Sequence, residues 1–396
     1  MAGADLGTMT QRGTRSGPRY LTVPELLILA VGTFTLGVDG YVLSGLLPEV
    51  SADLHVSMST AGQLTSLFAI VYAVGSPIVA ALTGNWDRRA LLAGGMAVFI
   101  VGMILQATGS SFAMVAAGRV VAALGAAAYQ SNAFSTAGLL SDDAHRARSL
   151  AVVAGGGSLA LVAGLPFGIL VGQAWGWRHA MWILVVLATI SCLAVAFLPA
   201  AHAPSLGLRG RVRVLTDARV GSVLIGSTMV LLPAFLLISF LPSVLHVSGT
   251  LVVIAMFGVG CGQVLATAAV PRLIRWRGSP FVLVLGACGI TVFAALLIVT
   301  RTTEVGAVVT LFGLGAGAGA AIVPQQHRLF ALVPTLAPIA MGLNGSAIYC
   351  AAAVGAALGG AVLAVGGAGA LAPAAAVIGL LAVTVAAVLR PERRNE

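Results

Sequence analysis

The sequence predicts an all-α membrane protein with twelve transmembrane helices arranged as two pseudo-symmetric six-helix bundles. The composition is the first reason, because 59% of the 396 residues are hydrophobic and only 8% are charged, whereas about 25% are charged in soluble proteins. The apolar runs are the second reason, since many of them reach the ~20 residues that a spanning helix needs. The third reason is the distribution of arginine along the chain, which alternates between basic and almost uncharged connections.

The apolar runs are long and lack the alternation of a β-strand, so each is predicted to be a helix that satisfies its own backbone hydrogen bonds in lipid. The first run exceeds the ~7–15 residues of a signal-peptide core and is predicted to be retained. The twelve predicted helices occupy residues 24–47, 58–82, 90–109, 111–139, 149–173, 179–199, 219–243, 247–271, 280–300, 304–324, 336–365 and 369–389.

The arginines predict the orientation of the chain. All 21 basic residues are arginine, and a cytoplasmic N-terminus places eighteen of them in cytoplasmic segments and only Arg178 and Arg301 in outer loops. This bias follows the positive-inside rule and predicts that both termini are cytoplasmic. The net charge of +9 is therefore explained by the membrane topology and indicates no nucleic-acid partner.

The longest interior loop, Pro199 to Asp217, is rich in proline and arginine and follows the sixth helix. It divides the chain into six plus six helices, a repeat pattern typical of transporters. The predicted parts are a cytoplasmic tail (1–23), an N-terminal bundle (24–199), a cytoplasmic linker (200–218), a C-terminal bundle (219–389) and a cytoplasmic tail (390–396).

Asp39 is the acidic residue that lies well inside an apolar run. A carboxylate at the centre of a bilayer costs roughly 2.5–3.5 kcal/mol on insertion scales, so it is expected to pair, face a cavity or carry a proton. Arg119 lies inside the fourth predicted helix, and both residues are expected about 12 Å from the outer surface at ~1.5 Å per residue. We expect the two to pair and to couple proton movement to transport; a purely structural ion pair is the alternative.

Other polar side chains within the predicted helices indicate a cavity. Helices one, two, four, seven and eleven are expected to enclose a mostly apolar space with a few polar anchors, which suits a lipophilic cargo. Amide and phenol groups in a membrane also hold helices together, so each of them has two interpretations. The predicted cavity residues are Tyr41, Tyr72, Tyr129, Asn132, Asn344 and Tyr349.

The fifth predicted helix has small residues at every fourth position from Gly156 to Gly176, a spacing that lets another helix approach closely. Pro166 within it predicts a kink. The glycine-rich run from Gly313 to Pro324 lacks the lysine of a nucleotide-binding loop, because the chain has no lysine, and is predicted to pack helices. No cofactor and no metal site are expected, since the four cysteines form no C-x-x-C pair. No ATP-hydrolysis motif occurs in the sequence, so the driving force is expected to be an ion gradient or the gradient of the cargo itself.

Several motifs, in this order along the chain, resemble the major facilitator superfamily. They are GTFTLGVDGYVLSGLLPEVSADL, AGQLTSLFAIVYAVGSP, LTGNWDRRALL, AGRVVAALGAAAY and AGLPFGILVGQAWGWR. The resemblance is greatest to the twelve-helix drug:proton antiporter branch, which includes bacterial chloramphenicol-resistance and arabinose-type sugar efflux proteins. It implies two six-helix bundles and transport by alternating access.

The resemblance also implies roles for particular residues. Asp87 and Arg88 match the Asp-Arg of the family's cytoplasmic latch motif, although Ala90 and Leu91 stand where the family usually has glycine and arginine. In the second half, Arg275 stands where the repeated motif would have aspartate.

Three further matches concern transport itself. Arg119 with Gly125 matches the helix-four motif, whose arginine is implicated in proton coupling. Asp39 resembles the helix-one acid of several of these exporters. The last match resembles the helix-five antiporter motif in a Gly-x-Pro variant, and its residues are Gly164, Pro166 and Gly168.

The expected function is proton-coupled export of a small lipophilic compound, such as the antibiotic chloramphenicol, across a bacterial plasma membrane. The expected partners are the cargo, protons and the lipid bilayer, with a single chain acting alone and no enzymatic activity. One alternative keeps the fold and exports a sugar, a nucleoside or another metabolite. A second alternative, a membrane receptor without transport, would need a long loop or soluble domain for its partner, whereas the longest loop here has about nineteen residues.

Overall fold

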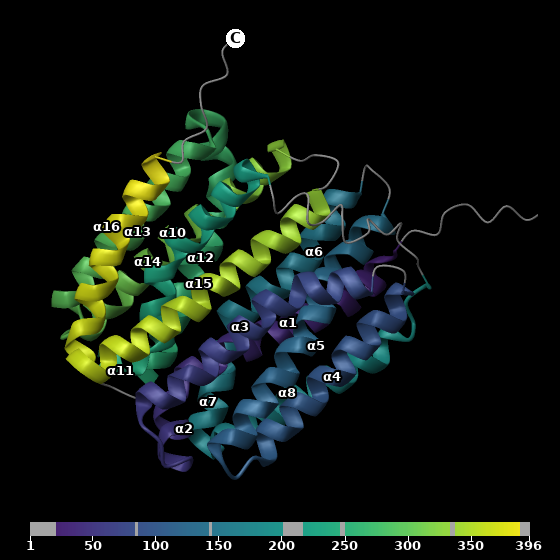
Figure 1. Cartoon of the computed structure of the whole chain (residues 1–396), viewed down its shortest axis with the longest axis horizontal. Helices are drawn as coiled ribbons and strands as arrows, with labels where there is room; N and C mark the ends of the chain where they lie inside the picture. The colour runs from purple at the N-terminus through teal and green to yellow at the C-terminus, as the bar shows by residue number, and fades with distance from the viewer. Residues whose placement is uncertain are drawn as a thin grey trace, which may run out of the picture.

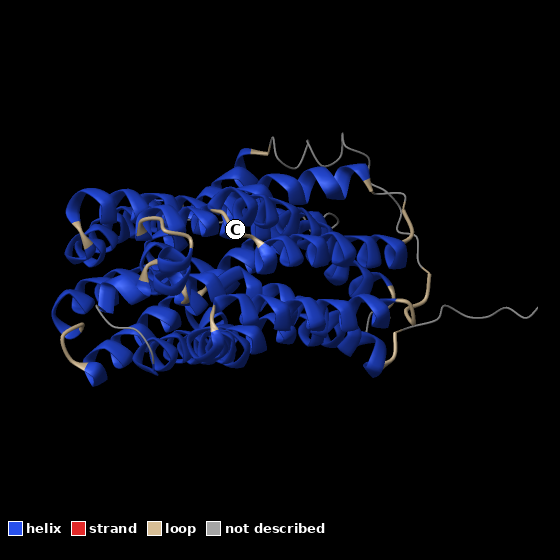
Figure 2. Cartoon of the chain, turned by 90° about the horizontal axis from the view of Figure 1, so that it is seen from below, coloured by secondary structure: helices blue, strands red, loops and turns tan. Residues whose placement is uncertain are grey.

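The computed structural model describes residues 21–83, 86–141, 145–200, 217–245, 250–332 and 337–388. Most of both predicted tails and of the predicted linker lies outside these ranges. The described residues form helices and no strand (Figure 2). Twelve of these helices are long and apolar enough to cross a membrane, which confirms the predicted fold class.

The first half contains six spans, and the fifth of them is made of three segments. Serine or aspartate side chains begin three of these helices in the usual way for N-caps: Ser57 accepts from Thr60 N at 3.0 Å and Asp87 from Ala90 N at 3.3 Å, and Ser111 begins the fourth span likewise. The elements are α1 (Val23–Gly45), α2 (Leu47–Asp53), α3 (Met58–Leu82), α4 (Arg88–Thr108), α5 (Phe112–Leu139), α6 (Arg146–Leu159), the π-helical η1 (Ala160–Gly164), α7 (Leu165–Trp175) and α8 (Trp177–Val195).

The second half repeats the pattern of six spans. Its first span is followed by a short helix, as α1 is followed by α2. The elements are α10 (Ala218–Ser239), α11 (Leu241–Leu245), α12 (Thr250–Arg277), α13 (Ser279–Thr300), α14 (Glu304–Leu332), α15 (Ala337–Gly366), the 3₁₀ turn η3 (Ala368–Ala370) and α16 (Leu371–Val388).

Two predicted helix ends are wrong, and both lie at a proline. The predicted helices 247–271 and 304–324 stop at Pro271 and Pro324, but α12 continues to Arg277 and α14 to Leu332. Proline removes a hydrogen-bond donor and usually ends a helix in water. In a membrane protein the neighbouring helices and local adjustments satisfy the freed backbone groups, so the helix continues.

The kink predicted at Pro166 takes the form of a π-helical segment. Residues 160–164 follow the wider π pattern, and Pro166 lies at the start of α7 directly after them. The proline nitrogen has no hydrogen to donate, and a single π turn inside a helix accommodates such a break in the ladder.

The two halves meet along two pairs of helices. In Figure 1, α15 runs beside α3, and these two elements pack extensively. The second pair is formed by α12 with η1 and α7. A Cβ atom on Gly260 of α12 would lie 2.8 Å from the backbone oxygen of Leu161, so the absence of a side chain allows this close approach.

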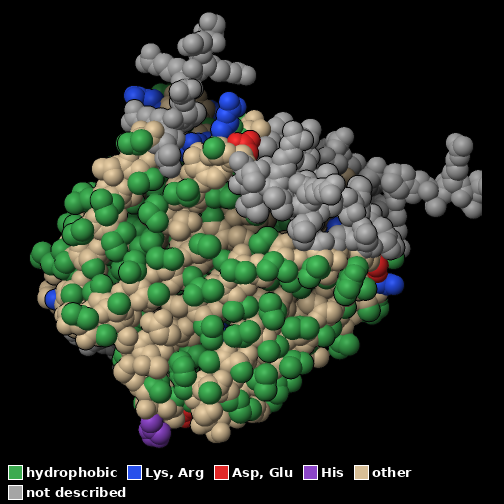
Figure 3. All heavy atoms as spheres, viewed as in Figure 1, with side chains coloured by type: hydrophobic (Ala, Val, Ile, Leu, Met, Phe, Trp, Pro, Cys, Tyr) green, Lys and Arg blue, Asp and Glu red, His purple; other side chains and the backbone are tan. Residues whose placement is uncertain are grey.

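The outer surface is largely apolar, as expected of a protein that faces lipid. On α8 the side chains of Trp182, Val186, Ile190 and Leu193 form one stripe, and each is more than 40% exposed. Figure 3 shows hydrophobic and uncharged side chains over the middle of one face, with charged groups towards its margins. Inside the first bundle, α5 buries mainly alanine and glycine. A soluble monomer rarely exposes so large an apolar surface.

Candidate functional site

Asp39 and Arg119 form a direct ion pair between α1 and α5. Arg119 Nη1 lies 2.8 Å from Asp39 Oδ1, and both side chains are 0% exposed. Asp39 lies six residues before the C-terminal end of α1, and Arg119 lies seven residues after the N-terminal end of α5, so each is about 10 Å from that end of its helix. The matched depth that the sequence predicts therefore brings the two groups together.

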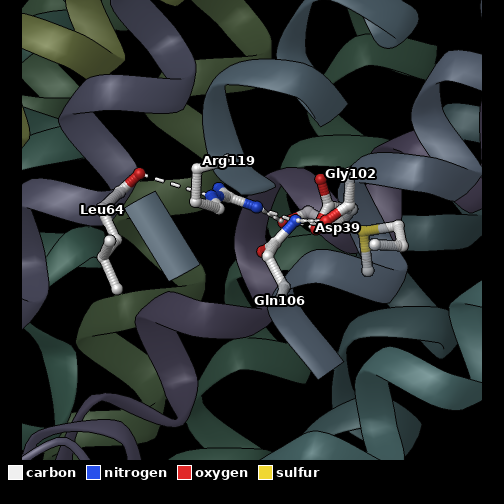
Figure 4. A network of polar contacts seen from close by, with 6 residues as sticks. Asp39, Leu64, Gly102, Gln106 and Arg119 are labelled. Carbon is white, nitrogen blue, oxygen red and sulfur yellow. Dashed lines mark hydrogen bonds and ion pairs between the residues drawn. The ribbon is translucent and has the colours of Figure 1, made fainter. Parts of the chain in front are cut away.

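Two neighbouring helices, α1 and α3, hold the guanidinium group of Arg119. Its Nε donates to the backbone oxygen of Leu64 on α3 at 3.3 Å, and its Cζ atom lies 4.3 Å from the centre of the Phe68 ring, a cation–π distance. Figure 4 shows Arg119 between Leu64 on one side and Asp39 on the other. Gln106 of α4, also drawn there, turns its amide to the oxygen of Gly102 at 3.3 Å.

The pair is not saturated with hydrogen bonds. Among the described residues, no partner is found for Asp39 Oδ2 or for Arg119 Nη2, although both atoms are buried. Guanidinium and carboxylate groups can form two parallel hydrogen bonds, and here one side-chain bond is made. One carboxylate oxygen is therefore available to receive a proton, which would remove the charge that balances Arg119.

The glycines of the fifth span face the helix that carries Asp39. An added Cβ atom on Gly164 would contact Val38 and Phe34, and one on Gly168 would lie 2.8 Å from Val42 Cγ2. The predicted close approach is thus made with α1 inside the first bundle. Pro166 lies between these glycines. The two glycines of the segment that resembles an antiporter motif therefore pack against α1.

The two latch-motif residues begin α4. Asp87 caps the helix, and the Nε of Arg89 lies 3.9 Å from its carboxylate. Arg88 is 5% exposed and donates to Asn132 Oδ1 on α5 at 2.5 Å. In the second half, Ser279 at the start of α13 forms a hydrogen bond with His327 near the end of α14 at 2.9 Å. The helices α13 and α14 are the third and fourth spans of their half, as α4 and α5 are of the first.

Three of the predicted cavity residues lie where the halves meet. Tyr41 is stacked parallel to Phe235 of α10 with ring centres 6.2 Å apart. Tyr349 of α15 contacts Tyr72 of α3, and their ring centres are 3.8 Å apart. Tyr349 also approaches Phe68, the ring that faces Arg119, at 6.2 Å.

The other three predicted cavity residues lie inside the bundles in this conformation. The hydroxyl group of Tyr129 donates to the Ile28 oxygen at 3.4 Å, within the first half. Asn344 accepts a hydrogen bond from Ser227 at 2.9 Å within the second half. Asn132 is the partner of Arg88. Each of the three is at most 4% exposed, and each forms a hydrogen bond with a neighbouring helix.

A small cavity lies between the halves next to the ion pair. Its walls come from α1, α3, α10 and α15, which are four of the five helices expected to form the cavity, and its volume is about 20 Å³. Drug-sized ligands occupy pockets of roughly 300–1,000 Å³. In this conformation the two halves therefore pack too closely at the depth of the ion pair to hold a drug-sized ligand.

A second, wider opening of about 530 Å³ lies where α3 begins and α15 ends. Phe240, at the break between α10 and α11, packs its ring beside Gly62 of α3 and Gly359 of α15. Ser59 also donates to the Gly360 oxygen at 2.8 Å across the halves. By the predicted orientation this closed end faces the outside.

The sequence did not predict the contacts of Arg119 with Leu64 and Phe68 on α3. A backbone carbonyl and a phenylalanine carry no distinctive signal in an apolar helix. The one available signal was the neighbouring polar residue Gln63.

The chain is similar to several known proteins. The family model of the Major Facilitator Superfamily matches residues 29–337. A chloramphenicol resistance protein of Streptomyces lividans is 33% identical over 282 residues, which are 63% of this chain and 71% of that protein. The inner membrane transport protein YdhP of Escherichia coli (strain K12) is 28% identical over 354 residues, or 86% of this chain and 89% of that one.

A solved structure shows the same fold. The crystal structure of a mutant of the nucleoside transporter NupG superposes with a TM-score of 0.72 at 13% identity, covering 92% of this chain and 100% of that chain. At this identity the likeness concerns the arrangement of the helices alone.

Proposed function

Because the chain belongs to the major facilitator superfamily, we propose that this multi-pass membrane transporter is a proton-coupled exporter of a small lipophilic compound. The observation that carries the proposal is the fully buried pair of Asp39 and Arg119. Ionisable groups within a membrane are costly and commonly mark ion or proton pathways. Here the carboxylate keeps one oxygen without a partner among the described residues.

The pair supports a simple cycle of alternating access. With the halves open to the outside, Asp39 takes up a proton and the cargo leaves. With the halves open to the cytoplasm, Asp39 releases the proton and new cargo binds, while Arg119 stabilises the charged carboxylate. One proton moving down ~100 mV supplies about 2.3 kcal/mol, which sustains a cargo gradient of roughly fortyfold because ~1.4 kcal/mol is tenfold.

The side chains that line the small cavity between the halves support a lipophilic cargo. Where the halves meet, the side chains are mainly aromatic and aliphatic, with Tyr41, Phe68 and Phe235 among them. Pockets of this kind bind apolar molecules with a few polar anchors. The similarity to a chloramphenicol resistance protein favours an antibiotic of that class as the cargo. The cavity is small in this conformation, so the cargo enters only when the halves separate.

The proposal also concerns the membrane in which the chain lies, its orientation and the number of chains that transport needs. We place the chain in a bacterial plasma membrane with both termini in the cytoplasm, as the arginine distribution predicts. A single chain then contains both bundles and the ion pair, so transport needs no second copy. Residues 24–199 and 219–389 are the two bundles that move relative to each other.

The proposal is tested by drug susceptibility in a bacterium that lacks its own efflux pumps. Cells expressing the wild type, Asp39→Asn or Glu304→Gln are compared at equal membrane expression against chloramphenicol, lipophilic dyes and polar metabolites. Glu304 is an exposed acid at the start of α14 and is the matched control.

We expect the wild type and Glu304→Gln to give resistance and Asp39→Asn to give none. Normal export by Asp39→Asn would remove the proton role from this carboxylate. Altered tolerance of a sugar or nucleoside, with no drug resistance, would retain the transporter and replace its cargo by a polar metabolite.

A further inference from the structure

The C-terminal end of α12 carries three arginines and no acidic residue. Its last two turns and the glycine after them read PRLIRWRG, from Pro271 to Gly278, and we call these residues the basic end of α12. The arginines are Arg272, Arg275 and Arg277, and all three are exposed. Among the described residues, no ion pair involves any of them. Three positive charges thus lie close together without an anionic side chain paired to them in the described parts of the chain.

The corresponding segment of the first half, between α3 and α4, is built differently. Asp87 caps α4, and its carboxylate lies 3.9 Å from the Nε of Arg89. Arg88 is 5% exposed and donates to Asn132 inside the first bundle. One arginine is therefore paired with an acid, and the other is used to join two helices. The positive charge at the basic end of α12 is less compensated.

The basic end of α12 continues a lipid-facing stripe of the same helix. The side chains of Phe257 and Leu265 are 47% and 61% exposed. Steps of three or four residues lead from Leu265 to Arg272 and Trp276 on the same face. Trp276 is 70% exposed, and tryptophan is enriched at the depth of the lipid headgroups. The arginines therefore lie where the apolar surface ends and the headgroups begin.

Arg277 lies over aromatic side chains of both helices. Its Cζ atom is 4.3 Å from the centre of the Trp276 ring and 5.6 Å from that of Phe281 in α13, which are cation–π distances. Phe281 and Leu285 are 43% and 46% exposed, so the lipid-facing side of α13 begins beside this guanidinium. A guanidinium that lies over a ring keeps its N–H groups at its edge, where they can donate to an oxygen ligand.

We propose that the basic end of α12 binds the headgroup of an anionic phospholipid such as phosphatidylglycerol. Guanidinium groups form charge-assisted and often paired hydrogen bonds with phosphate oxygens, and basic residues at the ends of membrane helices attract anionic lipids. The three arginines supply the donors, and the lipid tails lie along the exposed faces of α12 and α13. By the predicted orientation the lipid belongs to the cytoplasmic leaflet. The binding goes beyond export, because it needs neither cargo nor proton movement.

The test uses two exposed tryptophans as reporters of the lipids beside them. The purified full-length protein is placed in phosphatidylcholine vesicles with increasing fractions of brominated phosphatidylglycerol or of brominated phosphatidylcholine, since bromine quenches tryptophan fluorescence at short range. The fluorescence that disappears in Trp276→Phe belongs to Trp276. The fluorescence that disappears in Trp86→Phe belongs to Trp86, which is 58% exposed next to the start of α4. Neither cargo nor a proton gradient is present, so the result does not depend on the proposed export.

We expect phosphatidylglycerol to be preferred over phosphatidylcholine at Trp276 and not at Trp86. A basic residue near an anionic surface contributes roughly 1 kcal/mol, or about fivefold in affinity, so Arg272→Gln and Arg275→Gln should each lower the preference about fivefold. Both side chains are exposed, so these variants keep the test usable if Arg277→Gln disturbs the turn. Arg89→Gln is the matched control, because the Arg89 side chain is 45% exposed but lies beside an acid; it should leave the preference at Trp276 unchanged.

Equal quenching of Trp276 by the two lipids would overturn the site. An equal preference at Trp86 and Trp276 would also overturn it, since that result indicates a general attraction to the positive surface. A third contrary result is unchanged quenching in Arg272→Gln and Arg275→Gln with a loss of thermal stability that is the same in both lipids. The arginines would then serve only the negative end of the α12 dipole.

Discussion

At the residue scale, arginine suits the position of Arg119 because one planar group must satisfy several partners at once. It bonds to a carboxylate and a backbone carbonyl in two different helices and lies over an aromatic ring. A lysine ammonium is a compact point charge that cannot both form these two hydrogen bonds and lie flat over the ring. The geometry around the pair thus depends on more than its charge.

We therefore predict that Arg119→Lys, which keeps the positive charge, still lowers proton-driven export by about tenfold, the equivalent of ~1.4 kcal/mol of lost interactions. Export into inverted membrane vesicles with an imposed pH gradient measures the effect. Arg89→Lys is the control, since the Arg89 side chain is 45% exposed, and it should transport normally. Full activity of Arg119→Lys would show that charge alone is required.

Glu49 in the short helix α2 provides a prediction about stability and pH. Its Oε2 is buried without a partner among the described residues, and burial raises the pKa of this carboxyl above its usual 4.5, partly offset by a hydrogen bond to its own backbone. The folded protein therefore binds this proton more tightly than the unfolded chain. Stability should fall as the pH rises above about 4.5 and Glu49 becomes charged.

Glu49→Gln is accordingly expected to raise the thermal unfolding temperature in detergent at neutral pH by a small amount, with a free-energy gain below about 1 kcal/mol because the side chain is partly solvated. The gain should vanish near pH 4. The exposed Glu304→Gln should show no such difference. A lower unfolding temperature for Glu49→Gln at neutral pH would mean that the charged carboxylate is stabilising.

At the element scale, the fifth span determines where α1 lies. The face of α1 formed by Val38 and Val42 packs against Gly164 and Gly168, while Asp39 faces α5. The π-helical segment before α7 lets this glycine face continue past Pro166. The segment that resembles an antiporter motif thus packs against α1, the helix that carries Asp39.

We predict that Gly164→Ala destabilises the protein by about 1–3 kcal/mol, the usual cost of inserting a methyl group into a packed core, and weakens export. The new methyl group would contact Val38 and Phe34 and displace α1. Gly157→Ala, in the same span, is the control because an added methyl group there has open space. Thermal unfolding and drug resistance are measured for both, and equal stability of the two variants would contradict this role.

At the scale of the whole molecule, several of the contacts that hold the halves together lie towards the end where α3 begins. Ser59 bonds to Gly360, Phe240 fills the space beside Gly62, and Tyr349 contacts Tyr72 nearer the middle. Alternating access requires these contacts to break while each bundle stays intact. The structure therefore corresponds to a state that is closed at the end where α3 begins.

A cross-link across this end should stop transport. In a variant without the four native cysteines, Ser59→Cys with Gly360→Cys joins the halves, and we expect oxidation to abolish export and reduction to restore it. The control pair is Gly75→Cys with Ala127→Cys inside the first bundle, where the Cβ atoms would lie 3.9 Å apart, within disulfide range. Export measured before and after oxidation distinguishes them, and continued export with the halves joined would contradict movement at this end.

The sequence by itself determined the number of spans and their approximate positions. Membrane thickness and the need to satisfy every backbone group act on each segment separately, so no tertiary information is required. The same holds for the depth of Asp39 and Arg119, since the rise of a helix is constant. The two proline-containing helices were predicted too short because their continuation depends on neighbouring helices.

Tertiary structure alone decided which side of each helix faces which neighbour. Tyr129, Asn132 and Asn344 are of the residue types that line cavities but lie inside the bundles, whereas Leu64 and Phe68 contact Arg119. In a uniformly apolar helix the hydrophobic pattern does not mark one face, because lipid and protein interior are equally apolar. The orientation of a side chain then follows from close packing between small residues, and packing exists only once all twelve helices are assembled.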